Sequence, residues 1–118
     1  MDANITLNSI PFAKTFDERG GSERQSSARG INTPDVLIVK HQDATDNTYK
    51  SATKRRMIRI DRVAEDEDGK KYNTSAYLVL VIPEEAASED TDNVLATLRA
   101  LVASSDPDYL DQLLNNER

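Results

Sequence analysis

Residues 55–61 alternate between two kinds of side chain, and this is the most informative pattern in the chain. Ile58 and Ile60 would lie on one face of a strand. The other face would carry Arg55, Met57, Arg59 and Asp61. An acidic turn around Gly69 follows, and then an apolar run that ends at Pro83, a residue that cannot donate to a strand ladder. The pattern predicts an antiparallel hairpin with one apolar face to be covered and one cationic face left open.

Upstream of this hairpin the pattern predicts further strands. Residues 4–18 fit a short strand, a break at Ile10-Pro11 and a second strand. The polar residues 22–29 fit either a weak edge strand or a loop. Residues 35–42 are apolar enough to predict a strand, and the polar residues 43–53 predict a surface connection into the hairpin.

After Pro83 the apolar residues recur at helical spacing. Residues 88–92 offer several N-cap side chains, with acids in the first turn, where the helix dipole favours them. The apolar stripe that follows consists of Val94, Leu95, Leu98, Leu101 and Val102. Asp106 as a cap and Pro107 at the first helical position predict a second helix. Its apolar residues are Tyr109, Leu110, Leu113 and Leu114. Strands first and helices last predict an α+β fold, with helices covering one side of an antiparallel sheet.

The two helix stripes have two interpretations of about equal weight. They form either an ordinary core within one chain or a surface that a second chain covers. Only 37% of the 118 residues are hydrophobic and 31% are charged, so the core that one chain can build is thin. We expect a single domain over residues 1–118, with strands to about 83 and two helices over about 88–118. We also expect some apolar surface to be buried against a second copy.

Charge is distributed unevenly along the chain, whose formal net charge is −6. Residues 40–62 carry seven lysines and arginines against three aspartates, whereas residues 84–118 carry nine acidic residues against two arginines. This asymmetry predicts two surfaces with different neighbours. The absence of cysteine fits a reducing cytoplasm. No segment approaches membrane-spanning length and no signal-peptide pattern is present, so we expect no membrane partner.

Catalytic and metal-binding patterns are weak. The one histidine, His41, falls in the middle of a predicted strand without a partner nucleophile, which favours a structural role. The acidic residues 65–68 before Gly69 lack the spacing of a calcium loop and its closing glutamate. The four glycines form no phosphate-binding loop. We therefore expect no enzymatic activity, no cofactor and no metal.

Three segments together resemble the coat proteins of the single-stranded RNA bacteriophages (leviviruses). Residues 54–61 (KRRMIRID) are similar to the basic strand of that family, and residues 75–83 (SAYLVLVIP) are similar to its last strand. Residues 91–107 (TDNVLATLRALVASSDP) resemble its first helix and the turn between its helices. The resemblance extends from about residue 35 to the end and rests on the order of the elements.

The resemblance implies an amino-terminal hairpin, an antiparallel sheet and two helices that pack on the sheet of an intertwined dimer. It implies that two copies pair side by side into one sheet and that dimers assemble into an icosahedral shell. The sheet would face the genomic RNA, and in the family it also binds an RNA stem-loop that represses replicase translation. The expected location is the virion, assembled in the bacterial cytoplasm.

The resemblance also implies roles for individual residues, which strand parity assigns. The implied RNA-binding residues are Lys40, Gln42, Arg55, Met57, Arg59, Ser75 and Tyr77. On the same face would lie Asp61, Asn73, Val79 and Val81. Arg59 and Lys40 would neutralise phosphates, Tyr77 could stack on an unpaired base and Ser75 could hydrogen-bond one. A register slip of one residue in the strand of Lys40 would move it to the other face.

The implied dimer-interface residues are Leu95, Leu98, Leu101, Val102, Leu110 and Leu113. An alternative function remains, namely a small cytoplasmic RNA-binding regulator with the same order of elements but no shell. The acidic turn at 64–71 favours the coat protein, because a regulator has no need of it.

Overall fold

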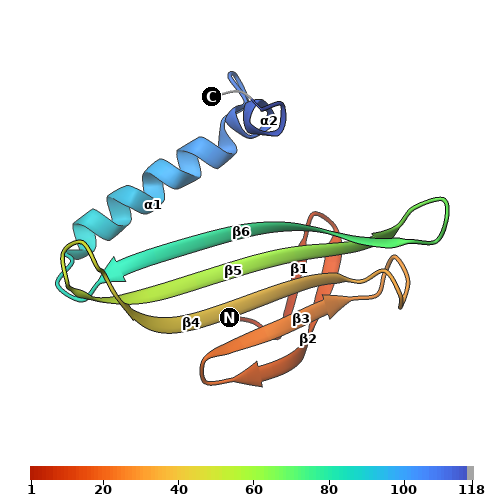
Figure 1. The fold of residues 1–118 in the computed structure, drawn as a ribbon, viewed down its shortest axis with the longest axis horizontal. Helices are drawn as coiled ribbons and strands as arrows, with labels where there is room; N and C mark the ends of the chain where they lie inside the picture. The colour runs from red at the N-terminus through yellow and green to blue at the C-terminus, as the bar shows by residue number, and fades with distance from the viewer. Residues whose placement is uncertain (117–118) are drawn as a thin grey trace. The chain divides into compact units, whose positions relative to one another are not determined.

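The structure, a computed structural model, describes residues 1–116. The chain divides into two compact units, Met1–Glu84 and Glu85–Arg118. The first unit is one six-stranded antiparallel sheet whose strands are neighbours in sequence order (Figure 1). The strands are β1 (Asn4–Leu7), β2 (Ile10–Glu18), β3 (Gly21–Ser26), β4 (Asp35–Thr45), β5 (Ala52–Glu65) and β6 (Lys71–Pro83). The predicted amino-terminal hairpin is therefore continuous with the main sheet.

The break between the first two strands lies two residues earlier than predicted. Asn8 and Ser9 form the turn, both with positive φ (51° and 62°). Pro11 is the second residue of β2, opposite Thr6 of β1. The pairing of β2 with β3 begins only at Ala13, so β2 has one neighbour at Pro11. The missing N–H of proline is tolerated where a strand is paired on one side only.

The segment predicted as an edge strand or a loop is an interior strand. β3 pairs with β2 on one side and with β4 on the other. Its start requires glycine, because a Cβ on Gly21 would lie 2.3 Å from the carbonyl oxygen of Val39. The polar composition of β3 concealed this position, since Arg24 and Ser26 are both buried.

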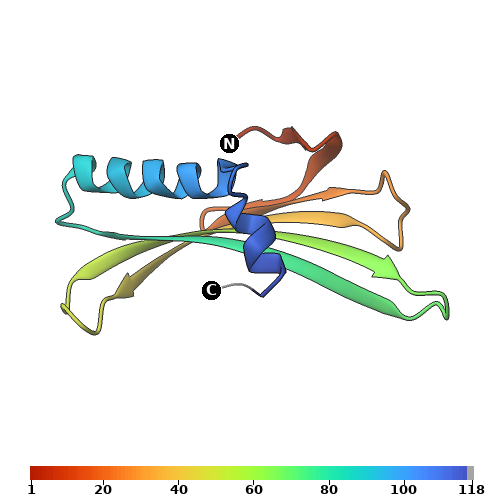
Figure 2. The same cartoon turned by 90° about the horizontal axis from the view of Figure 1, so that it is seen from above.

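The connection between β4 and β5 is shorter than the predicted 43–53. Both strands continue into it, and only residues 46–51 remain outside the sheet. The Asp46 side chain closes this turn by accepting hydrogen bonds from the backbone of Thr48 at 2.8 Å and Tyr49 at 3.3 Å. The result is a pair of long strands, which with β6 form the curved ribbon seen in Figure 2.

The buried core of the first unit is small and partly polar. Its buried apolar residues are Phe12, Leu37 and Val39. Beside them Arg24 is fully buried and donates to the Asp2 carbonyl from Nε at 2.9 Å and from Nη2 at 2.6 Å. These charge-assisted bonds offset the cost of removing the guanidinium from water. They also fasten the first residues of the chain to β3.

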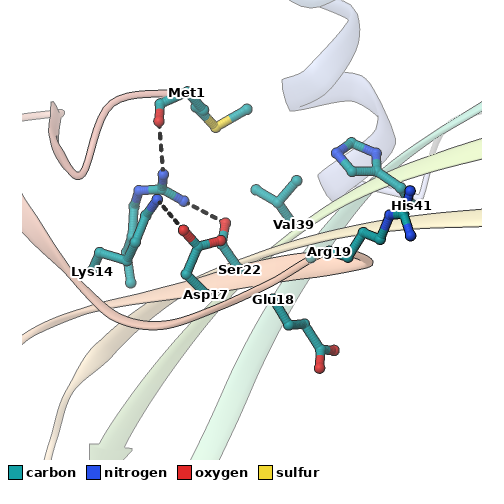
Figure 3. A pocket seen from close by; sticks show the side chains of 10 residues that line it. Met1, Lys14, Asp17, Glu18, Arg19, Ser22, Val39 and His41 are labelled. Carbon is teal, nitrogen blue, oxygen red and sulfur yellow. Dashed lines mark hydrogen bonds and ion pairs between the residues drawn. The ribbon is translucent and has the colours of Figure 1, made fainter.

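A shallow pocket lies beside Arg24 and Val39 (Figure 3). Lys14 and Asp17 form an ion pair at 3.1 Å in its wall, and His41 lies at its rim. Cationic and acidic side chains both line the pocket, so its charge is mixed.

The second unit contains helix α1 (Ser88–Ala103) and helix α2 (Tyr109–Leu114). The two helices were predicted to extend to residue 118, and Glu117 and Arg118 lie outside the described residues. α1 begins after Ala87, and no side chain caps it, so the predicted cap is wrong. The acids expected in its first turn are Glu89 and Asp90. No helix among the described residues is long and apolar enough to cross a membrane.

The start of α2 also differs from the prediction. Asp108, not Asp106, is the N-cap, and its side chain accepts a hydrogen bond from the backbone of Asp111 at 3.0 Å. Pro107 precedes the cap instead of occupying the first helical position. Two aspartates flank this proline in the sequence, and either is a good cap by composition.

Candidate nucleic-acid interface

The strand register brings the predicted RNA-facing residues onto one face of β4, β5 and β6. Lys40 is opposite Met57, and Gln42 is opposite Arg55, so β4 has the register that strand parity assumed. Arg59 is opposite Tyr77 on β6. We call this surface the basic face. Its members are Lys40, Gln42, Arg55, Met57, Arg59, Asp61, Asn73, Ser75, Tyr77, Val79 and Val81.

The cations of the basic face differ in how far their charge is compensated. Nη1 of Arg55 donates to the amide oxygen of Gln42 at 3.3 Å, and this partner is neutral. Lys40 is exposed and forms no ion pair within residues 1–116. Arg59 instead forms an ion pair with Asp61, Nε to Oδ1 at 2.8 Å. Lys40 and Arg55 are therefore the cations best able to neutralise an external anion.

Asp61 is the centre of a hydrogen-bond network on this face. It is only 7% exposed, and its Oδ1 accepts from Nε of Arg59, from the Ser75 hydroxyl and from Nδ2 of Asn73 at 3.2 Å. Burial opposes ionisation of the carboxyl. The hydrogen bonds from Ser75, Arg59 and Asn73 nevertheless hold the pKa of Asp61 below its ordinary value. The carboxylate is charged at neutral pH.

Tyr77 is the aromatic residue of the basic face. It is 58% exposed, and the guanidinium carbon of Arg59 lies 5.1 Å from the centre of its ring. That distance is within the range of a cation–π interaction. One side of the ring therefore has a cationic neighbour, and the phenol is available to solvent.

Towards the end of β6 the side chains that this strand places on the basic face are apolar. Val79 and Val81 are exposed on it, with Met57 opposite Val79 on β5. On β6 the polar side chains of the basic face are accordingly confined to Asn73, Ser75 and Tyr77, whereas Gln42 and Arg55 lie across the sheet from Val81. The face thus combines separate cations, one polar network and an apolar strip.

The opposite face of the same strands also carries cations. Lys54, Arg56 and Arg62 lie there by register. Nε of Arg62 lies 3.4 Å from the buried carboxylate of Asp35, so this arginine has a structural partner. His41 is opposite Arg56 on that face, and its ring makes no hydrogen bond within the described residues. The cationic strand therefore does not by itself define one binding surface.

The predicted dimer-interface residues are open to solvent in the second unit. No residue of α1 or α2 is buried. Leu95 and Leu98 are half-buried, while Leu101, Val102, Leu110 and Leu113 are exposed. Leu98 and Leu101 line a shallow apolar groove on α1 with Val94 and Thr97. The unit leaves its apolar stripe without a cover of its own.

Sequence reasoning missed two buried charges and the role of a third. Arg24 lies in a segment that looked polar, and Asp35 is the first residue of the predicted apolar strand at 35–42. No periodic signal marked either charge as buried. Asp61 was placed on the correct face, but its network joins residues twelve and fourteen positions away on β6. The available signal for this ion pair was the spacing of two residues between Arg59 and Asp61, which puts both side chains on one face of a strand.

No protein-family model and no curated protein sequence matches the chain. Solved structures do match. The coat protein of bacteriophage EMS014 has a TM-score of 0.72 and 18% identity, over 86% of this chain and 74% of that one. The virus-like particle of Beihai levi-like virus 21 has a TM-score of 0.72 and 12% identity, over 98% and 94%. The virus-like particle of bacteriophage GQ-907 has a TM-score of 0.68 and 19% identity, over 96% of this chain and 88% of that one.

These likenesses establish the fold. The arrangement of six antiparallel strands followed by two helices matches these coat-protein structures, which confirms the predicted α+β fold of strands followed by helices. The identities are below one in five, so the fold is retained where most side chains differ.

Proposed function

We propose that this chain is the coat protein of a single-stranded RNA bacteriophage, with a structural and not a catalytic role. It dimerises, assembles into an icosahedral shell in the bacterial cytoplasm and encloses genomic RNA in the virion. The observation that carries the proposal is the coat-protein fold combined with the basic face, on which Lys40 and Arg55 have no acidic partner within residues 1–116. The neighbours of known structure are a coat protein and virus-like particles.

The free edge of the sheet supports dimerisation. β6 is thirteen residues long and, within the described part of the chain, pairs only with β5. A long edge strand exposes unpaired N–H and C=O groups, which form a template for a further strand. Val79 and Val81 are exposed along it, so a second copy would bury apolar area as well as complete the ladder. Two β6 strands would join two sheets into one.

The helices support the same dimer. Their stripe of Leu95, Leu98, Leu101, Val102, Leu110 and Leu113 has no cover within the second unit. Exposed apolar stripes of this length mark a protein interface in a stable protein. We propose that each chain lays its helices against the sheet of its partner, which gives both surfaces a cover.

The basic face supports RNA binding. Lys40 and Arg55 have charges that no acidic neighbour compensates, and they would contact phosphates. Tyr77 would stack on an unpaired base, and Ser75, Gln42 and Met57 would line the contact. Binding of a translational-operator stem-loop belongs to the same proposal, and the polar network around Asp61 is the part of the face suited to it.

The proposal is tested by expressing the full-length chain in bacteria and examining the purified protein by electron microscopy and sedimentation. We expect uniform closed particles that contain nuclease-protected RNA. A soluble dimer that binds RNA without forming particles would favour a small RNA-binding regulator. A monomer without RNA would contradict the proposal.

A further inference from the structure

Arg59 is held from two directions on the basic face. Its Nε donates to Asp61 at 2.8 Å, and its guanidinium lies over the Tyr77 ring at 5.1 Å. Within residues 1–116 its two terminal nitrogens donate no hydrogen bond. The side chain is 34% exposed, so these terminal donors are accessible to a ligand. The structure thus presents a planar fork of N–H donors with its orientation already fixed.

We infer that Arg59 is a specificity-determining residue that reads the Hoogsteen edge of an unpaired guanine, and that Asp61 is its positioning residue. The O6 and N7 atoms of guanine are two adjacent acceptors that match the guanidinium fork. Adenine presents a donor at the position of O6 and cannot replace it. The inference rests on the proposed RNA-binding function and adds a base preference to it.

The charge of Asp61 favours a base over a phosphate at this position. A phosphate bound to Arg59 would approach a carboxylate that is ionised at neutral pH and largely shielded from water. Like charges at short range repel, most strongly where water is excluded. A guanine edge is uncharged and offers the same two acceptors. The strand pattern alone had assigned Arg59 to phosphates, and its partner Asp61 changes that assignment.

In this geometry Ser75 and Asn73 would not act as independent readers of a base. Both donate to Oδ1 of Asp61, and Asn73 donates to the Ser75 hydroxyl as well at 3.2 Å. Their donors are thus engaged in holding the carboxylate. A held carboxylate holds Arg59, because a fixed acceptor limits the rotamers of its donor. The network pre-organises one reader, which lowers the entropic cost of binding.

The test uses full-length protein freed of host RNA and four RNA hairpins that differ at one unpaired loop position. The position carries guanine, inosine, 7-deazaguanine or adenine. Inosine keeps O6 and N7, 7-deazaguanine lacks N7 and adenine lacks the O6 acceptor. We expect guanine and inosine to bind alike and the other two to bind on the order of tenfold more weakly.

Two variants test the roles of the residues. Arg59→Lys keeps the charge and removes the fork, and it should bring the four affinities together. Asp61→Asn should also reduce the preference for guanine, although removal of a negative charge raises affinity for all four hairpins. Asp43→Asn is the matched control, because it removes one exposed carboxylate from the opposite face. It should leave the preference for guanine intact.

The outcomes separate this inference from the function on which it rests. If all four hairpins bind equally well to the unmodified protein, Arg59 does not read guanine and RNA binding stands. If 7-deazaguanine binds as well as guanine while inosine binds weakly, the Watson–Crick edge is read and the inference is overturned. If no hairpin binds, the proposed RNA-binding function fails.

Discussion

Replacing Arg55 by serine should change the salt dependence of RNA binding, and replacing Arg59 should change it less. The side-chain partner of Arg55 is the neutral Gln42, so its full positive charge can meet a phosphate. Arg59 shares its charge with Asp61 at 2.8 Å. The two arginines are four positions apart on one strand and lie on the same face, which makes them a matched pair.

The expected size follows from counterion release. Each phosphate contact on single-stranded nucleic acid contributes about 0.7 to the slope of log affinity against log salt concentration. Arg55→Ser should therefore make this slope shallower by about 0.7, and Arg59→Ser by clearly less. Lys54→Ser is the control, because Lys54 is exposed on the opposite face and should leave the slope unchanged.

The assay is a titration of unstructured RNA with full-length protein at several salt concentrations, with thermal melting measured in parallel. Melting should change little, because single surface charges contribute little to stability. If Lys54→Ser reduced the slope as much as Arg55→Ser, the opposite face would be the one that contacts RNA. If Arg55→Ser left the slope unchanged, the assignment of phosphate contacts would be refuted.

Four further changes test other parts of the structure. Leu98→Ala should lower the free energy of unfolding by about 2–5 kcal/mol if a partner completes its burial. Sedimentation should then show the yields of dimer and of particles falling together. The control Leu114→Ala, at an 83% exposed position, should leave both yields unchanged. An unaltered dimer in Leu98→Ala would make Leu98 a residue of its own chain's core only. Tyr77→Ala should weaken binding to single-stranded loops by about 1–3 kcal/mol without altering the salt slope, as titration would measure; a changed slope would argue against stacking. Arg24→Met should destabilise the protein by about 1–3 kcal/mol in urea unfolding, because the Asp2 carbonyl loses the donors that tie the start of the chain to β3. An unchanged urea midpoint would exclude that role. Because folding lowers the pKa of Asp61, the contribution of its carboxylate to stability is present above pH about 4 and is lost as the pH falls further. The difference in melting temperature between the unmodified protein and Asp61→Asn should therefore shrink at pH 3. A difference that stays constant with pH would contradict the lowered pKa.

The positions of the elements could be predicted well wherever side chains followed one period. The alternation over residues 55–61 and the apolar run to Pro83 correspond to β5 and β6, and the helical spacing after Val94 corresponds to α1. The predicted boundaries were wrong where they rested on a single residue, such as a proline. Pro11 is tolerated inside β2 because the strand is paired on one side only at that residue. The local sequence does not indicate which strands pair with β2.

The polar segment of β3 could not be predicted because its stability does not come from an apolar face. Arg24 is buried and donates hydrogen bonds to the carbonyl of Asp2, which lies 22 positions earlier in the chain; Ser26 of the same strand is buried as well. Local composition contains no trace of such distant partners. Interior strands of this kind are recognised only when the pairing on both sides is known.

The sequence by itself determined the order of the elements, the parity of the three long strands and the unequal charge of the two ends. These follow from local periodicity, since the alternation of side chains along a strand is a property of the backbone. The tertiary structure decided which charges are free. Arg55 and Arg59 look equivalent in the sequence, yet one faces an amide and the other a carboxylate that two residues of β6 hold in place. Charge compensation depends on distances across strands, and only the folded sheet fixes those distances.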